Sequence, residues 1–225
     1  MVWDLEWDNV FKKQDWGKYP PECLIRFIAK YYYNSDRKTI KILEVGSGTG
    51  TNIWYMAREG FDVYGVEGSM TAVEKAKRRM EGDALHATII QGDILNLPFQ
   101  KENFDAVIDG DCLYCNSTED TNKALSEIKR VLKSGGLFFS RTPTDKMYIG
   151  KSYDTVGDAE YKNISDGPLQ GKGLARLSNR DMIEAMYGKY FKILSIDRED
   201  HTRDNGYILV SKWVIVCQST SKKVD

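Results

Sequence analysis

The feature that most constrains this chain is a glycine-rich stretch that follows a short apolar run. Residues 40–45 read Ile-Lys-Ile-Leu-Glu-Val, which is the composition of a buried β-strand. Gly46, Gly48 and Gly50 then occupy alternate positions, and residues 52–59 carry apolar side chains at helical spacing. Glycines allow positive φ angles and let a ligand approach bare backbone, and the next helix directs free N–H groups at that ligand. The stretch therefore predicts the first half of a nucleotide-binding βαβ unit.

The glycine loop by itself fits NAD, FAD and other adenosyl ligands. Its spacing is G-x-G-x-G rather than the dinucleotide pattern G-x-G-x-x-G, and Glu44 stands two residues before the first glycine. Residues 61–66 are predicted to form a second strand that ends at Glu67, where an acid accepts hydrogen bonds from ribose hydroxyls. Residues 87–91 are predicted to form a third strand, which is followed by Asp93. Three successive strands thus each bring an acid to the same edge of the sheet.

This combination resembles the class I S-adenosylmethionine-dependent methyltransferases of the small-molecule type. The resemblance implies that S-adenosylmethionine is the cofactor and S-adenosylhomocysteine the product. It places residues 44–50 against the methionine part, Glu67 on the ribose hydroxyls, Asp93 and the N–H of Ile94 at the adenine, and the backbone at Asp109 near the methionine ammonium. The candidate cofactor-binding residues in these segments are Glu44, Gly46, Ser47, Gly48, Gly50, Asn52, Glu67, Gly68, Ser69, Asp93, Ile94 and Asp109.

Strands and helices alternate along the rest of the chain. Residues 104–109 match the fourth strand of the family, and residues 132–139 match the end of a helix and the fifth strand, with Gly135 and Gly136 expected to stop that helix. Residues 191–196 and 207–216 are predicted to form a final antiparallel pair. The predicted helices are 22–33, 52–59, 69–80, 119–132 and 179–187. We therefore expect an α/β fold with a Rossmann-like, doubly wound, seven-stranded sheet, mostly parallel with an antiparallel last strand, and helices on both faces.

The length of 225 residues favours a single domain. Its predicted parts are an N-terminal helical lid (1–37), a cofactor-binding core (38–141), an acceptor-binding insertion (142–178), and a C-terminal helix with the antiparallel strand pair (179–225). The insertion is long, polar and rich in glycine, and connections of that length usually carry function. In the lid, Trp16 and Tyr19 are candidates to cover the cofactor or to line the acceptor site; Tyr19 is counted with the cofactor-binding residues.

Candidates for catalysis lie where the fourth strand ends. Asp111 is a candidate general base or hydroxyl orienter, and Tyr114 is a candidate to shape the acceptor site. His201, expected between the last two strands, is a third candidate, whereas His86 is expected at the surface. Cys112 and Cys115 form a lone C-x-x-C, which lacks both thioredoxin-like surroundings and a second pair for zinc, so we interpret them as lining a loop.

Composition restricts the partners. The formal net charge is −1 and no basic stripe appears, so nucleic acid is not expected. No apolar run approaches the roughly 18 residues that cross a bilayer, and four cysteines without an export signal favour a cytoplasmic setting. No metal-ligand set stands out, and a monomer or a homodimer is expected.

The acceptor is expected to be a small polar molecule, with a sugar or nucleotide-sugar hydroxyl preferred. Two alternatives stay open from the residues alone. A protein or RNA methyltransferase would bind its partner over the long insertion. An NAD-linked oxidoreductase or a non-catalytic cofactor-binding module would use the same glycine loop, although the glycine spacing disfavours nicotinamide cofactors.

Overall fold

The computed structural model describes residues 6–14 and 16–221 of the chain. Its centre is a seven-stranded sheet in the order β3-β2-β1-β4-β5-β10-β9. β1 to β5 pair in parallel, and β10 is antiparallel to both of its neighbours. This confirms the predicted sheet and its antiparallel last strand. The strands are β1 (Lys41–Val45), β2 (Asp62–Glu67), β3 (Thr88–Gln91), β4 (Phe104–Gly110), β5 (Leu132–Pro143), β9 (Lys192–Arg203) and β10 (Ile208–Gln218).

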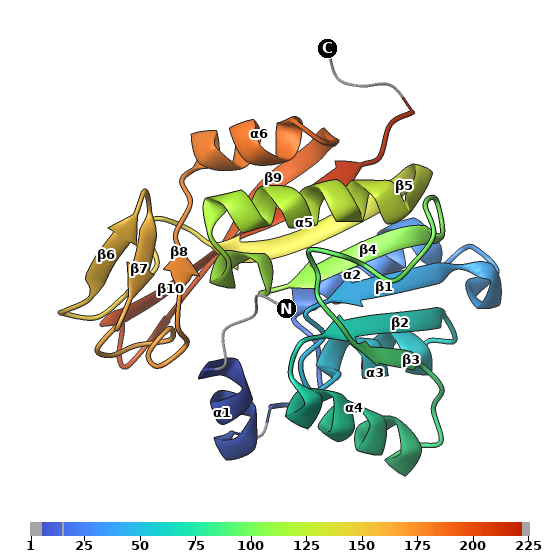
Figure 1. Ribbon diagram of the computed structural model, residues 1–225, viewed down its shortest axis with the longest axis horizontal. Coiled ribbons are helices and arrows are strands. Elements are labelled where there is room, and N and C mark those ends of the chain that lie inside the picture. The colour runs from blue at the N-terminus through green and yellow to red at the C-terminus, as the bar shows by residue number, and fades with distance from the viewer. Residues whose placement is uncertain (1–5, 15, 222–225) are drawn as a thin grey trace.

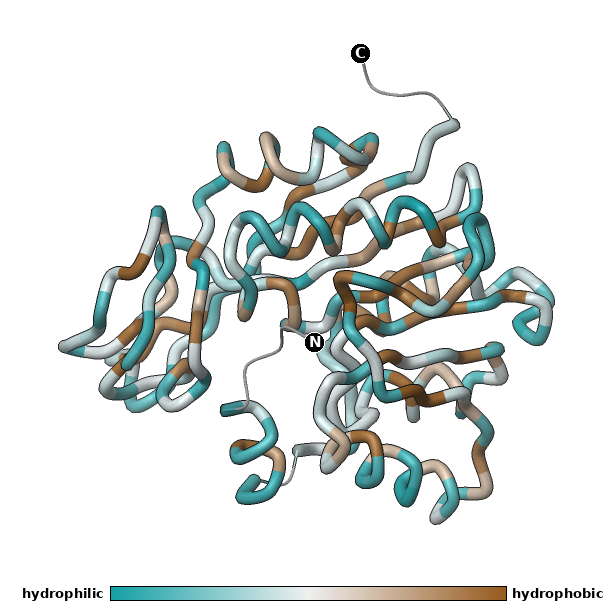
Figure 2. The backbone as a smooth tube through the Cα atoms, viewed as in Figure 1, coloured by the Kyte–Doolittle hydropathy of each residue, from teal (hydrophilic) through white to brown (hydrophobic). Residues whose placement is uncertain are grey.

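Helices cover both faces of the sheet (Figure 1). Successive strand residues point to opposite faces, so Ile42 of β1 packs in one buried cluster and Leu43 in the other. The first cluster includes side chains of α2, α3 and α4, and the second those of α5 and α6. Figure 2 shows the apolar residues gathered on the central strands. The helices are α2 (Glu22–Tyr32), α3 (Thr51–Arg58), α4 (Met70–Gly82), α5 (Thr118–Val131) and α6 (Arg180–Gly188).

The predicted role of the glycine pair after α5 is wrong. The helix ends at Val131, because Leu132 already has extended backbone angles and pairs with Phe104 of β4. Gly135 has φ +80° and lies where the pairing of β5 with β4 is irregular, between Leu132 and Leu137, the two residues of β5 on either side of the register shift. The pair therefore shapes a bulge in the strand, and pairing with β4 ends the helix.

The insertion between β5 and α6 contains a second sheet that the sequence analysis did not predict. Its three strands are β6 (Asp154–Gly157), β7 (Glu160–Lys162) and β8 (Ala175–Arg176). A small apolar cluster supports it and includes Tyr114 from the region after β4. Arg176 is 1% exposed and donates to the carbonyls of Leu113 and Asn116 and to the Thr121 hydroxyl. The insertion is thus bonded to the segment that follows β4.

A short helix, α1 (Glu6–Lys13), lies beside α4 (Figure 1). Its one buried side chain is Phe11. None of the helices in the described residues is both long and apolar enough to cross a membrane.

Candidate active site

The glycine loop between β1 and α3 is fixed by backbone bonds and close packing. The amides of Gly46 and Ser47 both donate to the Val66 carbonyl at the end of β2, at 2.8 and 3.2 Å. Gly46, Gly48 and Gly50 all have positive φ angles. A Cβ on Gly46 would overlap the Cys112 side chain, and a Cβ on Gly50 would lie 2.9 Å from that of Ala76. Two of the three glycines are therefore required by space as well as by backbone angle.

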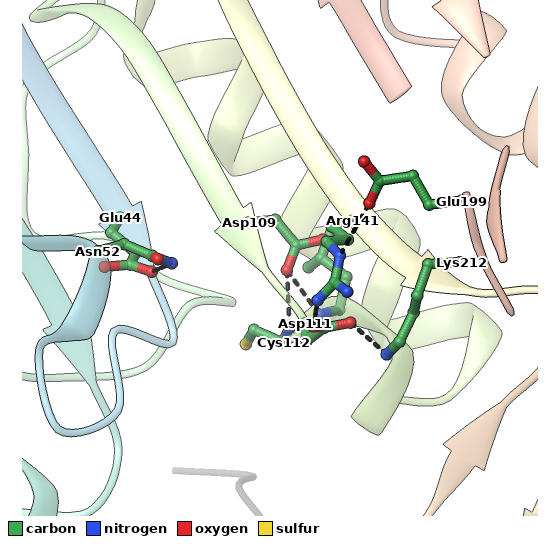
Figure 3. Close-up of polar contacts among 9 residues, drawn as sticks. Glu44, Asn52, Asp109, Asp111, Cys112, Arg141, Glu199 and Lys212 are labelled. Carbon is green, nitrogen blue, oxygen red and sulfur yellow. Dashed lines mark hydrogen bonds and ion pairs between the residues drawn. The ribbon is translucent and has the colours of Figure 1, made fainter. Parts of the chain in front are cut away.

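A buried set of hydrogen-bond acceptors lies beside this loop. Asn52 donates from Nδ2 to Glu44 Oε1 at 2.6 Å (Figure 3). The other side-chain oxygens of Glu44 and Asn52 are buried and have no partner among the described residues, and the same holds for Oγ of Ser47 and Oγ1 of Thr49. Burial raises the pKa of Glu44 to about 8. Unpaired buried acceptors are unfavourable by about 1–3 kcal/mol each, so this set fits a ligand that brings donors, such as an ammonium group.

Glu67, at the end of β2, ties the loop to the start of α4. Its two carboxylate oxygens accept from the amides of Gly48 at 2.7 Å and Ser69 at 2.9 Å. Burial raises the pKa of Glu67, although these amides oppose the shift. Ser69 caps α4, because its hydroxyl accepts from the Ala72 amide. Each carboxylate oxygen has a second lone pair, so its expected contacts with ribose hydroxyls remain compatible with these bonds.

The predicted adenine-binding residues lie at the neighbouring end of β3. The Gly92 amide donates to the Glu67 carbonyl, and Gln91 donates to the Gly68 carbonyl. Asp93 is half-buried and accepts from the Leu95 amide at 3.0 Å. Ile94 packs at the edge of the second buried cluster. The structure thus brings these residues beside the end of β2, and their roles toward adenine remain predictions.

The N-terminal segment contacts this region through residues that only partly match the predicted ones. Phe11 lies against the loop, since a Cβ on Gly48 would stand 3.5 Å from its ring. Asp8 accepts from the Ser69 hydroxyl at 2.6 Å. Trp16 lies between Phe11 and Lys172. Tyr19 is 74% exposed and its ring meets the edge of Trp54 instead.

Sequence reasoning therefore missed Phe11 as the aromatic residue on the loop. The four-residue spacing of Trp7 and Phe11 is the signal that would have found it, because residues four apart share one face of a helix. The structure does not bring Tyr19 to the glycine loop.

At the end of β4, Asp109 organises the turn that follows. It is fully buried and accepts from the amides of Cys112 and Leu113 and from the Ser140 hydroxyl. Burial raises its pKa to about 6. The next residue, Gly110, packs against the Glu44–Asn52 pair. The backbone at Gly110 therefore adjoins the buried acceptors, while the Asp109 carboxylate bonds within the turn; the expected place of this backbone near the methionine ammonium remains a prediction.

Asp111 stands between two cations (Figure 3). It has φ +70° and accepts from Arg141 at 2.6 Å and from Lys212 at 2.5 Å. Burial favours a higher pKa, but Lys212 and Arg141 outweigh it and the pKa of Asp111 is lowered. A carboxylate with a lowered pKa stays ionised and is a weak base. Of its two predicted roles, this environment favours that of hydroxyl orienter over that of general base, and both remain predictions.

The other catalytic candidates differ in their surroundings. Tyr114 lies in the 3-10 turn η2 (Leu113–Cys115), is 2% exposed, and has the Lys212 ammonium 5.2 Å from its ring. His201 was expected in the link between the last strands, but it lies within β9, exposed and paired with Val210. The strands extend further into the hairpin than the sequence pattern indicates. His86 is exposed, as expected.

Cys112 and Cys115 are free thiols in the turn after β4, which agrees with the loop interpretation. Burial raises both pKa values, that of Cys115 to about 12. Across the described residues, no group of three or more His, Cys, Asp or Glu side chains is arranged to hold a metal ion.

Comparison with solved structures defines the class of this fold. A S-adenosylmethionine-dependent methyltransferase from Methanosarcina mazei superposes with a TM-score of 0.72 at 17% identity, covering 87% of this chain and 98% of that one. At that identity the likeness concerns the fold, which is the Rossmann-like fold of class I methyltransferases.

Sequence comparison gives the family. Residues 42–136 match the model of a family described as a methyltransferase domain. The matched segment is a class I S-adenosylmethionine-dependent methyltransferase domain, and the methyl donor of this class is S-adenosylmethionine.

Two relatives illustrate the extent of the match. An uncharacterised protein of Haemophilus influenzae is 31% identical over 151 residues, which cover 65% of this chain and 58% of that protein. A fatty-acid O-methyltransferase of Mycolicibacterium smegmatis is 28% identical over 194 residues, which cover 80% of this chain and 69% of that protein.

Proposed function

We propose that this protein transfers a methyl group from S-adenosylmethionine to a small polar acceptor. The observation that carries the proposal is the buried set of acceptor oxygens around Glu44 and Asn52, placed against the glycine loop. The free oxygens of Glu44 and Asn52 accept no hydrogen bond from the described residues, and the α-amino group of the methionine part has the N–H donors that they need. Class membership sets the cofactor, and the orphaned acceptors are a feature of this chain that fits it.

S-adenosylmethionine supplies an already activated methyl group. The residues of the chain therefore need chiefly to bind the cofactor, to align the acceptor with the methyl group and to exclude water. Glu44 and Asn52 hold the ammonium through their free side-chain oxygens. Phe11 covers the loop at Gly48 and keeps water from it. Tyr114, beneath Lys212, forms the base of the acceptor side.

Support for a small acceptor comes from the two segments that lie beside the acceptor side, the insertion and the N-terminal segment. The insertion packs its buried side chains against Tyr114, and Trp16 of the N-terminal segment lies against Lys172 of the insertion. The acceptor side is thus flanked by two segments of the chain itself, which favours a small molecule over a macromolecule. The fatty-acid O-methyltransferase relative acts on a small molecule and is consistent with this choice. A sugar or nucleotide-sugar hydroxyl remains one candidate acceptor, and no contact in the described residues singles it out.

Titration calorimetry with S-adenosylhomocysteine, using NAD as the matched control, tests the cofactor. We expect saturable binding of the first and none of the second. A panel of small acceptors, read by mass spectrometry for a gain of about 14 daltons, tests methyl transfer. Binding of NAD without binding of S-adenosylhomocysteine would overturn the proposal in favour of an oxidoreductase.

A further inference from the structure

We propose that the acceptor carries an oxyanion, a carboxylate or a phosphate, and that Lys172, Lys212 and Arg141 recognise it. The inference rests on the proposed function and deepens it, because it names the chemical class of the acceptor. The three cations come from different elements: Arg141 from β5, Lys212 from β10 and Lys172 from the insertion just before β8.

These cations exceed the acidic groups around them. Asp111 is shared between Arg141 and Lys212. Glu199 approaches Arg141 Nε only to 3.9 Å and is 43% exposed (Figure 3). Nε of Arg141 is buried and has no hydrogen-bond partner in the part of the chain that the structure describes. The guanidinium therefore keeps a donor for a further acceptor, and planar N–H pairs suit carboxylate and phosphate oxygens.

Lys172 is the cation whose surroundings point most directly to a ligand. Among the described residues it forms no ion pair, and its ammonium lies 5.1 Å from the centre of the Trp16 ring. Burial, followed by repulsion from Lys212, lowers its pKa, while Asp111 only partly opposes this. A half-buried ammonium held beside a second one is stabilised by an added anion. An oxyanion between Lys172 and Lys212 supplies that charge.

The cation cluster adjoins the region where the methyl group would be delivered. Asp111 directly follows Gly110, which packs against Asn52 and Glu44, and Cys112 packs against Gly46. The carboxylate that Arg141 and Lys212 share thus lies one residue beyond the predicted cofactor-binding backbone. An oxyanion held there would fix one end of the acceptor beside the loop, with Tyr114 below it and Trp16 at its side.

A purely structural explanation is that the cations hold Asp111 in its positive-φ conformation. It applies to Arg141 and Lys212, which bond to Asp111, but not to Lys172, which forms no such bond among the described residues. Lys172→Met is therefore the decisive variant. Lys162→Met, an exposed residue of β7 in the same insertion, is the matched control for loss of charge.

The activity arm compares acceptors in matched sets: a free carboxylic acid, its neutral amide, and a phosphate ester of the same skeleton. We expect the acids or the phosphates to be methylated and the amides to be poor acceptors. Lys172→Met should raise KM for the charged acceptor roughly tenfold or more, the scale of a lost charged hydrogen bond, and Lys162→Met should leave it unchanged. Rising salt should raise the KM of the charged acceptor in wild type and not in Lys172→Met. Equal use of acid, amide and phosphate would overturn the inference and leave methyl transfer standing.

A binding arm does not depend on turnover. Acetate, benzoate and inorganic phosphate are titrated into the protein, with and without S-adenosylhomocysteine, and the melting temperature is followed. We expect stabilisation by benzoate or by phosphate, which also separates the two sources of oxyanion, and its loss in Lys172→Met but not in Lys162→Met. If the variant responded to every anion as wild type does, the inference would be wrong, whatever the cofactor result.

Discussion

The two halves of the candidate site lie side by side and are opposite in charge. The cofactor half is lined by buried acids, and the pKa values of Glu44, Glu67 and Asp109 are all raised by burial. The acceptor half is lined by cations around Asp111, and the pKa of that carboxyl is lowered. Gly110 is the link between them. The contrast teaches that the site is prepared to accept a cationic group on one side and an anionic group on the other.

The largest effect is expected at Gly46, where the glycine loop leaves no space for a side chain. Gly46→Val forces a side chain into Cys112 at φ +62°. We expect loss of S-adenosylhomocysteine binding by calorimetry and a clear fall in the free energy of unfolding. Gly60→Ala is the control, because Gly60 has φ +91° and an added Cβ would have no atom within 4 Å. This variant should lose only the free energy of holding a non-glycine residue at positive φ, about 1–2 kcal/mol. Equal destabilisation by both variants would contradict the packing argument.

The acceptor half is tested next by Asp111→Asn, which leaves Arg141 and Lys212 without their shared carboxylate. We expect a loss of about 1–3 kcal/mol in stability at neutral pH, lower turnover, and little change in cofactor affinity. Because the folded pKa of Asp111 lies below its ordinary value of 3.8, its contribution is present above that pH and is lost as pH falls further. Acid unfolding of the variant should therefore be less steep, as measured by circular dichroism. Unchanged turnover would remove Asp111 from the mechanism.

Glu44→Gln should have opposite effects on stability and on cofactor binding. The ordinary pKa is 4.5 and the folded value is about 8, so the folded protein holds a proton that the unfolded chain releases. Stability without ligand is then fully present below about pH 4.5 and falls as pH rises to about 8, by the order of a few kcal/mol. The variant should lack this fall and bind S-adenosylhomocysteine roughly tenfold or more weakly. Parallel pH profiles of the two proteins in thermal denaturation would contradict the assignment.

The smallest effect is expected at the cover of the cofactor half. Phe11→Ala removes the ring that lies on Gly48, and we expect S-adenosylhomocysteine to dissociate several-fold faster in stopped-flow measurements, since α1 is a short peripheral helix. Tyr19→Ala is the control, because that residue lies outside the loop. Faster release from the Tyr19 variant alone would instead favour the predicted role of Tyr19 at the cofactor.

Local sequence determined most of the fold and the cofactor half. The β1 strand, its glycine turn and the Ser69 cap of α4 are encoded by adjacent residues, so their pattern predicts them. The second sheet was missed because its strands are only two to four residues long, which is too short for an apolar alternation to mark them. The sequence also could not reveal the cation cluster, since Arg141, Lys172 and Lys212 meet only after β10 inserts beside β5.

Arg176 couples the stability of the insertion to that of the turn after β4. Because its guanidinium holds the Leu113 and Asn116 carbonyls from within the second sheet, opening of that sheet would release the turn that carries Tyr114. The two segments should therefore exchange their amide hydrogens as one cooperative unit. A variant library that redesigns the insertion should therefore keep Arg176, because its loss would also destabilise the turn that places Tyr114 in the acceptor site.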